Sequence, residues 1–253
     1  MPLNLLNRRF TLAAALLVLL GGALALWRTA EPPAPAAPPS GSYVLAISWH
    51  PAFCETAPDL GECRDAEGAY TATHLALHGL WPRGSEYCGV SDELAALDAG
   101  RRWHDLPAIE VDDALAARLR RVMPGTAAAL DRHEWLLHGT CSGATAQTYF
   151  ARAVTLLDAV NASPVRDLLA RNAGRHVSRS QVRAAFDAAF GAGAGRKVRL
   201  DCADDSGRTL ISELRLNLTG DVMGSTPLDD LLHAGRNAGA GCTGGIVDRP
   251  GRR

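Results

Sequence analysis

Six cysteines spread along the chain place the strongest constraint on its fold: Cys54, Cys63, Cys88, Cys141, Cys202 and Cys242. No two of them form a C-x-x-C pair, which disfavours a zinc ribbon or a thioredoxin motif. An even number of scattered cysteines indicates three disulfides formed in an oxidising compartment. Spacing alone leaves their connectivity open. The 253 residues, 47% of them apolar, suffice for a single domain with a full core.

The N-terminus carries the export signal that such disulfides require. Arg8 and Arg9 precede an apolar run over residues 10–27, which is typical of a signal peptide or a signal anchor. The run approaches the roughly 20 residues of a membrane span. We therefore expect residues 1–30 either to be removed after export or to tether the protein to the membrane.

The rest of the chain predicts one folded domain. Residues 31–41 are a Pro/Ala-rich linker with nothing to bury, so the domain is expected over 42–253. Strand patterns lie near both ends of this domain, at 43–49, 71–78, 197–202 and 209–218. Helical patterns fill the middle, at 92–99, 111–122, 130–138, 146–160, 163–174 and 178–190. We expect an α+β fold with a central antiparallel β-sheet, helices packed on it and stabilising disulfides.

The charge of the chain argues against a stable nucleic-acid binder. The formal net charge is −1, and Lys197 is the only lysine. Such binders usually neutralise several phosphates with basic side chains. An enzyme that meets a nucleic acid briefly at one cleft remains compatible with this charge.

Two segments carry the candidate chemistry: His78–Pro82 (HGLWP) and His133–Cys141 (HEWLLHGTC). In each, a histidine immediately precedes a glycine, which lets a substrate approach the imidazole closely. Glu134 and His138 are four residues apart, so on a helix they share one face. His133 precedes His138 by five residues, which places it about 140° away around the helix.

The same spacing disfavours a zinc hydrolase. The H-E-x-x-H motif needs histidines four residues apart on one helix face, whereas His133 and His138 are five residues apart. His74 and His78 can share a strand face, but no third ligand is evident. Cys141 is a poor nucleophile if all cysteines are paired, and Ser142 lacks the G-x-S-x-G setting. We expect no metal and no cofactor.

Two histidines and a carboxylate, without metal or nucleophile, suit the transesterification of RNA. One imidazole removes the proton of the ribose 2′-OH, and the other protonates the departing 5′-oxygen. Histidine serves both roles because its ordinary pKa of about 6.5 allows both forms near neutral pH. Since the attack needs the 2′-OH, RNA is the expected substrate and DNA is not.

These motifs resemble the two active-site segments of the ribonuclease T2 family. The stretch LAISWHPAFC at 45–54, the Met-Pro-Gly at 123–125 and the helix at 178–190 resemble the bacterial periplasmic ribonuclease I branch. The resemblance implies an endoribonuclease that cleaves single-stranded RNA through a 2′,3′-cyclic phosphate. It also implies a periplasmic or secreted protein, with RNA as a transient partner. We expect a monomer, tethered to the inner membrane if residues 10–27 are retained.

The resemblance implies a role for each site residue. His138 would be the general base toward the 2′-OH, and His78 the general acid toward the 5′-oxygen. Glu134 would orient and tune the histidine pair and help to stabilise charge at phosphorus. His133 would contact the phosphate. Trp81 would stack on a base.

The resemblance also implies how the cysteines pair: Cys54–Cys63, Cys88–Cys141 and Cys202–Cys242. The second disulfide would hold the end of the catalytic helix to the segment after HGLWP. The other two would close a short local loop and a loop near the C-terminus.

One position departs from the family pattern. The family has a lysine before the second histidine, assigned to transition-state charge stabilisation, and this chain has Leu137. The loss of such a group can cost about 10²–10³ in rate. Arg132 and Arg83 are candidates to supply the charge. Arg83 also replaces an acidic base-contacting residue, so no base preference is implied. Leu137 therefore leaves one alternative, a weak or inactive ribonuclease fold that binds or inhibits.

Overall fold

The computed structural model describes residues 41–64 and 66–251. The predicted export segment over residues 1–30 lies outside this range, as do residues 31–40 of the predicted linker. Residue 41 was expected in that linker but is the first residue of a strand. Within the described residues, no helix is both long enough and apolar enough to cross a membrane.

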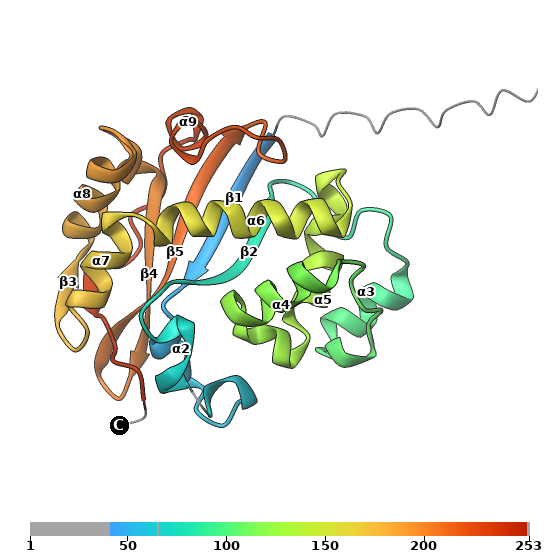
Figure 1. Cartoon of the computed structure of the whole chain (residues 1–253), viewed down its shortest axis with the longest axis horizontal. Helices are drawn as coiled ribbons and strands as arrows, with labels where there is room; N and C mark the ends of the chain where they lie inside the picture. The colour runs from blue at the N-terminus through green and yellow to red at the C-terminus, as the bar shows by residue number, and fades with distance from the viewer. Residues whose placement is uncertain (1–40, 65, 252–253) are drawn as a thin grey trace, which may run out of the picture. The chain divides into compact units, whose positions relative to one another are not determined.

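A six-stranded β-sheet organises the domain (Figure 1). Its strands are β1 (Gly41–Ser48), β2 (Ala76–Pro82), β3 (His176–Ser178), β4 (Val198–Asp205), β5 (Arg208–Gly220) and β6 (Gly244–Ile246). β1 pairs antiparallel with β2 and β5, and β4 pairs antiparallel with β5. β6 pairs antiparallel with β3 but parallel with β5. The predicted α+β fold is confirmed, and its sheet is antiparallel apart from the β5–β6 pair among the named strands of the described chain.

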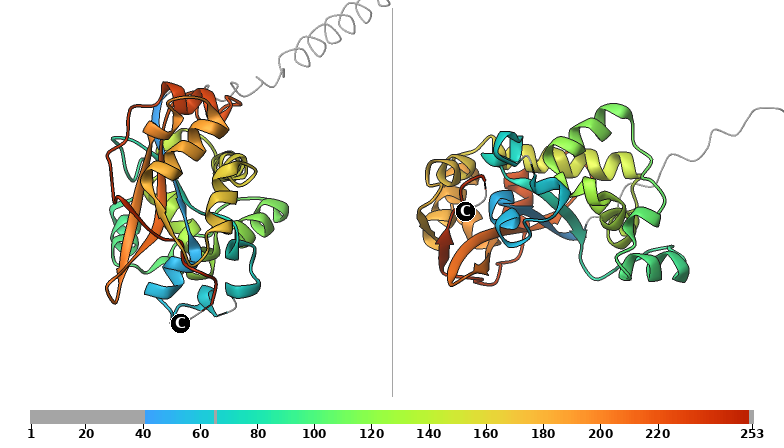
Figure 2. Two further views of the ribbon diagram at one scale, coloured as in Figure 1. Left: turned by 90° about the vertical axis from the view of Figure 1, so that its left-hand side faces the viewer. Right: turned by 90° about the horizontal axis from the view of Figure 1, so that it is seen from below.

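Helices pack on one face of this sheet and lie beyond its edges (Figure 2). They are α2 (His50–Thr56), α3 (Asp92–Ala99), α4 (Asp113–Val122), α5 (Leu130–Leu137), α6 (Ala146–Asn161), α7 (Pro164–Arg171), α8 (Arg179–Phe190) and α9 (Leu228–Ala234). Ser91, Ser163 and Ser178 each accept a backbone N–H of the first turn, which explains why α3, α7 and α8 begin there. α6 runs across one face of the sheet and packs on β1 and β2 (Figure 1, Figure 2).

The strands differ in what they bury. β1 is buried on both faces, as its apolar run predicts, since Tyr43–Ile47 are all buried. β5 instead alternates. Its core face carries Leu214, Leu216 and Leu218. Its opposite face carries Glu213, Arg215 and Asn217. This polar face of β5 supports the site described below.

The second predicted strand is misplaced. The sequence predicts a strand over 71–78, whereas residues 70–72 form a 3-10 turn and β2 begins at Ala76. His74 therefore does not share a strand face with His78; it stacks on the ring of Tyr70 at 4.0 Å. α2, α9, β3 and β6 are absent from the sequence prediction because elements of three to seven residues show little periodicity.

The six cysteines form three disulfides: Cys54–Cys63, Cys88–Cys141 and Cys202–Cys242. This is the pairing that the family resemblance implies. Cys88–Cys141 joins the segment after β2 to the 3-10 turn after α5, across 53 residues of sequence. It therefore links the two segments that carry the candidate chemistry.

Candidate active site

β2 and the end of α5 pack so closely that the two motif glycines, Gly79 and Gly139, have no space for a side chain. A Cβ on Gly79 would overlap the carboxylate of Glu134 and the indole nitrogen of Trp81. A Cβ on Gly139 would overlap the ring of Trp135. Close packing therefore explains why both positions are glycine, in addition to the predicted approach of a substrate.

His78 lies between two carboxylates. Its Nδ1 is 2.6 Å from Glu213 Oε2, and its Nε2 is 3.5 Å from Glu134 Oε1. Burial favours the neutral imidazole, but the hydrogen bond to Glu213 and the charges of both glutamates outweigh it and raise the pKa of His78. Burial likewise tends to raise the pKa of Glu213, but His78 and Arg215 together lower it. His78 is therefore held toward its protonated form.

Glu134 occupies the buried centre of the site. The residue is 1% exposed, and its Oε2 accepts a hydrogen bond from Trp81 Nε1 at 2.7 Å. Burial raises the pKa of Glu134, although the charge of His78 and the bond from Trp81 oppose the shift. This carboxyl group therefore retains a proton more readily than an exposed glutamate does.

His138 has the opposite surroundings. α5 ends at Leu137, so His138 caps the helix, and its backbone N–H still bonds to the Glu134 carbonyl at 3.2 Å. Its Nδ1 is buried without a hydrogen-bond partner among the described residues. Burial, followed by the charges of His133 and His78, lowers the pKa of His138 to about 4. The imidazole of His138 is therefore neutral at pH 7.

Trp81 lies between the two histidines. Its ring meets His78 edge-on at 5.2 Å and His138 at 5.4 Å between centroids. The guanidinium of Arg215 lies over the indole, 5.2 Å from its centroid. The structure thus brings His78, Trp81, Glu134 and His138 together, as the motifs predict.

His133 has its own set of partners. Its Nδ1 is 2.8 Å from Asp98 Oδ1, and its ring stacks on Trp103 with centroids 4.5 Å apart. Asp98, only 2% exposed, also accepts a hydrogen bond from the Tyr87 hydroxyl at 2.7 Å. These contacts fix the orientation of the His133 ring and leave its Nε2 as the nitrogen available to a ligand.

The motifs do not contain Glu213 or Asp98. Glu213 is 135 residues from His78 in sequence but shares a hydrogen bond with it. The available signal was the alternation in β5, because a glutamate that alternates with apolar residues in a buried strand needs a partner for its charge. Asp98 carries no comparable signal, since an acidic residue on α3 is indistinguishable from an ordinary surface group.

The two arginines considered as replacements for the family lysine are engaged elsewhere. Arg132 donates to the backbone carbonyls of His104 at 2.9 Å and Leu106 at 2.7 Å. Arg83 donates to Asn217 Oδ1 at 2.5 Å. Neither bond brings its guanidinium to His78 or His138.

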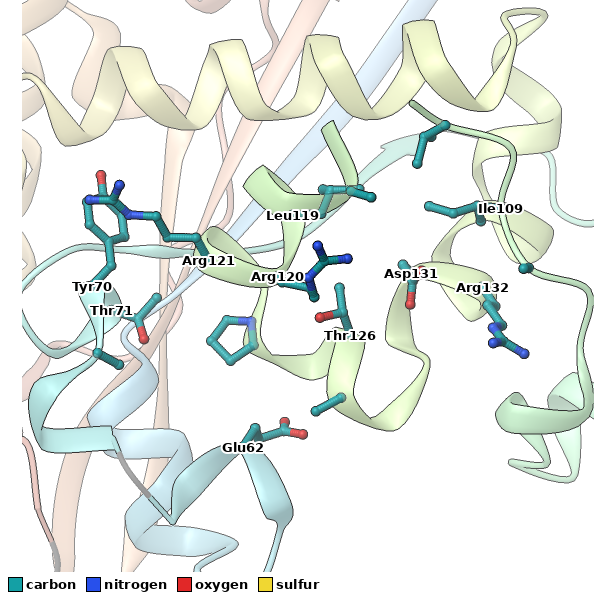
Figure 3. Close-up of a pocket in the computed structure, with 16 residues that line it drawn as sticks. Glu62, Tyr70, Thr71, Ile109, Leu119, Arg120, Arg121, Thr126, Asp131 and Arg132 are labelled. Carbon is teal, nitrogen blue, oxygen red and sulfur yellow. The ribbon is translucent and has the colours of Figure 1, made fainter. Parts of the chain in front are cut away.

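A cavity of about 660 Å³ lies on the other side of Arg132, away from the two motif histidines His78 and His138 (Figure 3). Its wall includes Tyr70, Arg121 and Asp131, and Arg121 lies over the Tyr70 ring, 4.6 Å from its centroid. Among the described residues that line it, none is a motif histidine or Glu134. This cavity is therefore separate from the candidate active site.

Comparisons with known sequences agree with the motifs. The model of the ribonuclease T2 family matches residues 40–227. Ribonuclease I of Escherichia coli (strain K12) is 29% identical over 211 residues, which cover 72% of this chain and 76% of that protein. Ribonuclease MC of Momordica charantia is 32% identical over 169 residues, which cover 63% of this chain and 80% of that protein.

Solved structures share the fold. The SF11-RNase of Nicotiana alata, associated with self-incompatibility, has a TM-score of 0.55 at 14% identity and covers 83% of this chain and 100% of its own. Actibind, a T2 ribonuclease, has a TM-score of 0.52 at 19% identity and covers 84% of this chain and 88% of its own. Because the family model spans most of the sequence, this chain belongs to the ribonuclease T2 family and is an endoribonuclease of that type.

Proposed function

We propose that the enzyme cleaves single-stranded RNA by metal-independent transesterification through a 2′,3′-cyclic phosphate. The observation that carries this proposal is the contrast between its two histidines. The pKa of His78 is raised and that of His138 is lowered to about 4, so near neutral pH His78 keeps its proton more readily than an ordinary histidine does, while His138 is free to accept one. A site whose two titratable groups are shifted apart is equipped for paired acid and base catalysis.

In the proposed reaction, His138 removes the proton of the ribose 2′-OH. The 2′-oxygen attacks the adjacent phosphorus, and the bond from phosphorus to the 5′-oxygen breaks. His78 gives its proton to that leaving oxygen. The products are a 2′,3′-cyclic phosphate and a free 5′-hydroxyl, and the two histidines end in exchanged protonation states.

Glu134 supports both parts of this reaction. Its Oε1 faces His78 Nε2 at 3.5 Å, while Trp81 holds its Oε2. The charge of Glu134 helps to raise the pKa of His78, so this carboxylate orients the proposed acid and stabilises its protonated form. This geometry supports the orienting and stabilising roles that the family resemblance implies.

His133 and Trp81 are the proposed substrate contacts. Asp98 holds His133 Nδ1, so the free Nε2 can bind a phosphate oxygen. Trp81 is partly exposed and offers a base an indole whose nitrogen is fixed by Glu134. Base stacking on Trp81 is worth about 1–3 kcal/mol where such contacts have been measured.

The disulfides support an exported enzyme. Structural disulfides persist in oxidising compartments, and the chain contains three of them. We therefore place the enzyme in the periplasm or outside the cell. Whether residues 10–27 tether it to the inner membrane is tested by its release from membranes in salt-washed cell fractions.

The direct test is incubation of the purified protein with RNA in EDTA. We expect 2′,3′-cyclic phosphate ends, detected by mass spectrometry, and no cleavage of DNA of the same sequence. RNA that stays intact at micromolar protein would favour a binding or inhibitory role. Cleavage that needs added divalent metal would contradict the histidine mechanism.

A further inference from the structure

Beside the catalytic residues, a second cavity is lined by arginines. It has a volume of about 490 Å³ and shares Trp81 with the catalytic site. Its cationic side chains come from four separate parts of the chain: Arg83 after β2, Arg199 on β4, Arg215 on β5 and Arg236 after α9. We call this cavity the arginine pocket. Four arginines around one cavity are unusual in a chain whose net charge is −1.

The arginines of the pocket are only partly neutralised. Arg199 and Arg215 share Asp201, at 2.6 and 3.2 Å, and Arg215 also binds Glu213 at 2.5 Å. None of the described residues that line the pocket is a carboxylate. Arg199 and Arg215 are also direct cross-strand partners, an arrangement of like charges that destabilises a sheet unless something offsets it. The pocket therefore has an excess of positive charge.

Arg83 and Arg236 carry most of this excess. Arg83 donates to the neutral amide oxygen of Asn217, and within the described part of the chain neither arginine forms an ion pair. Burial and the nearby charge of Arg236 lower the pKa of Arg83. Asn217 is 6% exposed, and its Nδ2 donates to the Arg236 carbonyl at 3.1 Å, which fixes both segments at the pocket. Two cations are thus held near each other, and none of the described carboxylates forms an ion pair with them.

The pocket adjoins the chemistry but is distinct from it. Arg215 lies over Trp81 on the pocket side and binds Glu213, which in turn binds His78. A scissile phosphate must lie within reach of both catalytic histidines. An anion in the arginine pocket would sit beyond Trp81 and would therefore be a different phosphate from the one that is cleaved.

We propose that the arginine pocket binds a backbone phosphate next to the scissile one, so that the enzyme prefers RNA with a flanking phosphate over a dinucleoside monophosphate. This inference rests on the proposed function. Guanidinium groups match phosphate oxygens in bidentate geometry, and RNA carries such a phosphate at each neighbouring nucleotide. The pocket also concentrates attraction for RNA at one place on a chain of slightly negative charge.

The test compares two kinds of substrate with the full chain. One is a dinucleoside monophosphate, and the other is the same dinucleotide with a terminal phosphate added on its 5′ or 3′ side. We expect kcat/KM to be about tenfold higher with a phosphate on one of the two sides, as one charge-assisted contact provides. Equal values for all these substrates would overturn the inference, whereas failure to cleave any of them would count against the proposed function instead.

Variants locate the effect in the pocket. Arg236→Ala and Arg83→Ala should each reduce the preference for the flanking phosphate to about twofold or less. Each should also make the slope of log(kcat/KM) for RNA against log salt concentration shallower by about one unit, the value expected for one lost phosphate contact. The matched control is Arg120→Ala, which removes an arginine from the other cavity. A preference that persists in both pocket variants, or that falls equally in Arg120→Ala, would overturn the proposed site. Thermal unfolding curves show that each variant is folded.

Discussion

The sheet side and the helix side of the active site treat an imidazole in opposite ways. On the sheet, His78 sits between Glu213 and Glu134, and their negative charges outweigh the cost of burying a cation. At the end of α5, His138 is buried without a partner for its Nδ1 among the described residues, and nearby positive histidines disfavour its protonation. These opposite shifts of the two imidazole pKa values support the proposed roles of His78 as the acid and His138 as the base.

The two pKa shifts depend on the element that carries each histidine, a strand for His78 and a helix end for His138. In a sheet, a long side chain of β5 can reach a residue of β2 across the intervening strand β1, and Glu213 contacts His78 in this way. A helix end offers a position with few side-chain partners. The Cys88–Cys141 disulfide links the segment that follows His78 to the segment that follows His138.

The largest expected effect is the loss of either histidine. Both His78→Ala and His138→Ala should lower kcat/KM for RNA by about 10²–10⁴, the usual contribution of general acid or base catalysis. The exposed His104 provides the control, and His104→Ala should retain activity. A large loss in only one of the two variants would contradict paired catalysis.

A substrate with an activated leaving group separates the two roles. An aryl ester of a nucleoside 3′-phosphate needs no protonation of its leaving oxygen. We therefore expect His78→Ala to recover most of the lost rate on this substrate, whereas His138→Ala should stay about 10²-fold or more impaired. Recovery in His138→Ala instead would reverse the assignment.

A smaller effect is expected from Glu213→Gln, which removes the charge beside His78. Burial then dominates and the pKa of His78 falls, so less of it is protonated at pH 7 and kcat/KM should drop about tenfold. Because the pKa of His78 falls, the alkaline limb of the pH profile of kcat/KM should move to lower pH. Glu62→Gln, at the wall of the separate cavity, is the matched control. An alkaline limb that does not move would show that Glu213 has no influence on the acid.

The pH profile of the unmodified enzyme should reflect both environments. His138 must be neutral, so kcat/KM should fall as pH drops through its pKa of about 4. His78 must be protonated, so kcat/KM should fall as pH rises through its raised pKa, above the ordinary value of about 6.5. A profile that is still rising with pH above that value would be incompatible with His78 as the acid.

The smallest expected effect concerns Leu137. Leu137→Lys restores the cation of the family pattern and should raise kcat up to about tenfold by stabilising the charged transition state. Leu137→Met, of similar size and without charge, is the control. If kcat does not change, another group already supplies this charge.

The motifs predicted the centre of the site better than its surroundings. His78, Trp81, Glu134 and His138 could be placed together because each lies in a short segment with a recognisable pattern. Glu213 was missed, since its pairing with His78 depends on the register of β5 against β1 and of β1 against β2. Register is a property of the whole sheet and is not written in any local window.

The sequence likewise predicted some elements of the fold correctly and others wrongly. Helices α3, α7 and α8 were predicted from their capping serines, and β1 from its apolar run. The strand over 71–78 was wrong because its alternating pattern extends into a 3-10 turn that the sequence alone does not distinguish. The arginine pocket was not predicted, since its four arginines come from segments that only the tertiary structure brings together.

Titration of the two imidazoles by NMR tests the central contrast most directly. With labelled histidine, and with His78→Gln and His138→Gln to assign the signals, each pKa can be read from chemical shift against pH. We predict a pKa near 4 for His138 and a pKa above the ordinary 6.5 for His78. Equal values, or a higher pKa for His138 than for His78, would contradict the account.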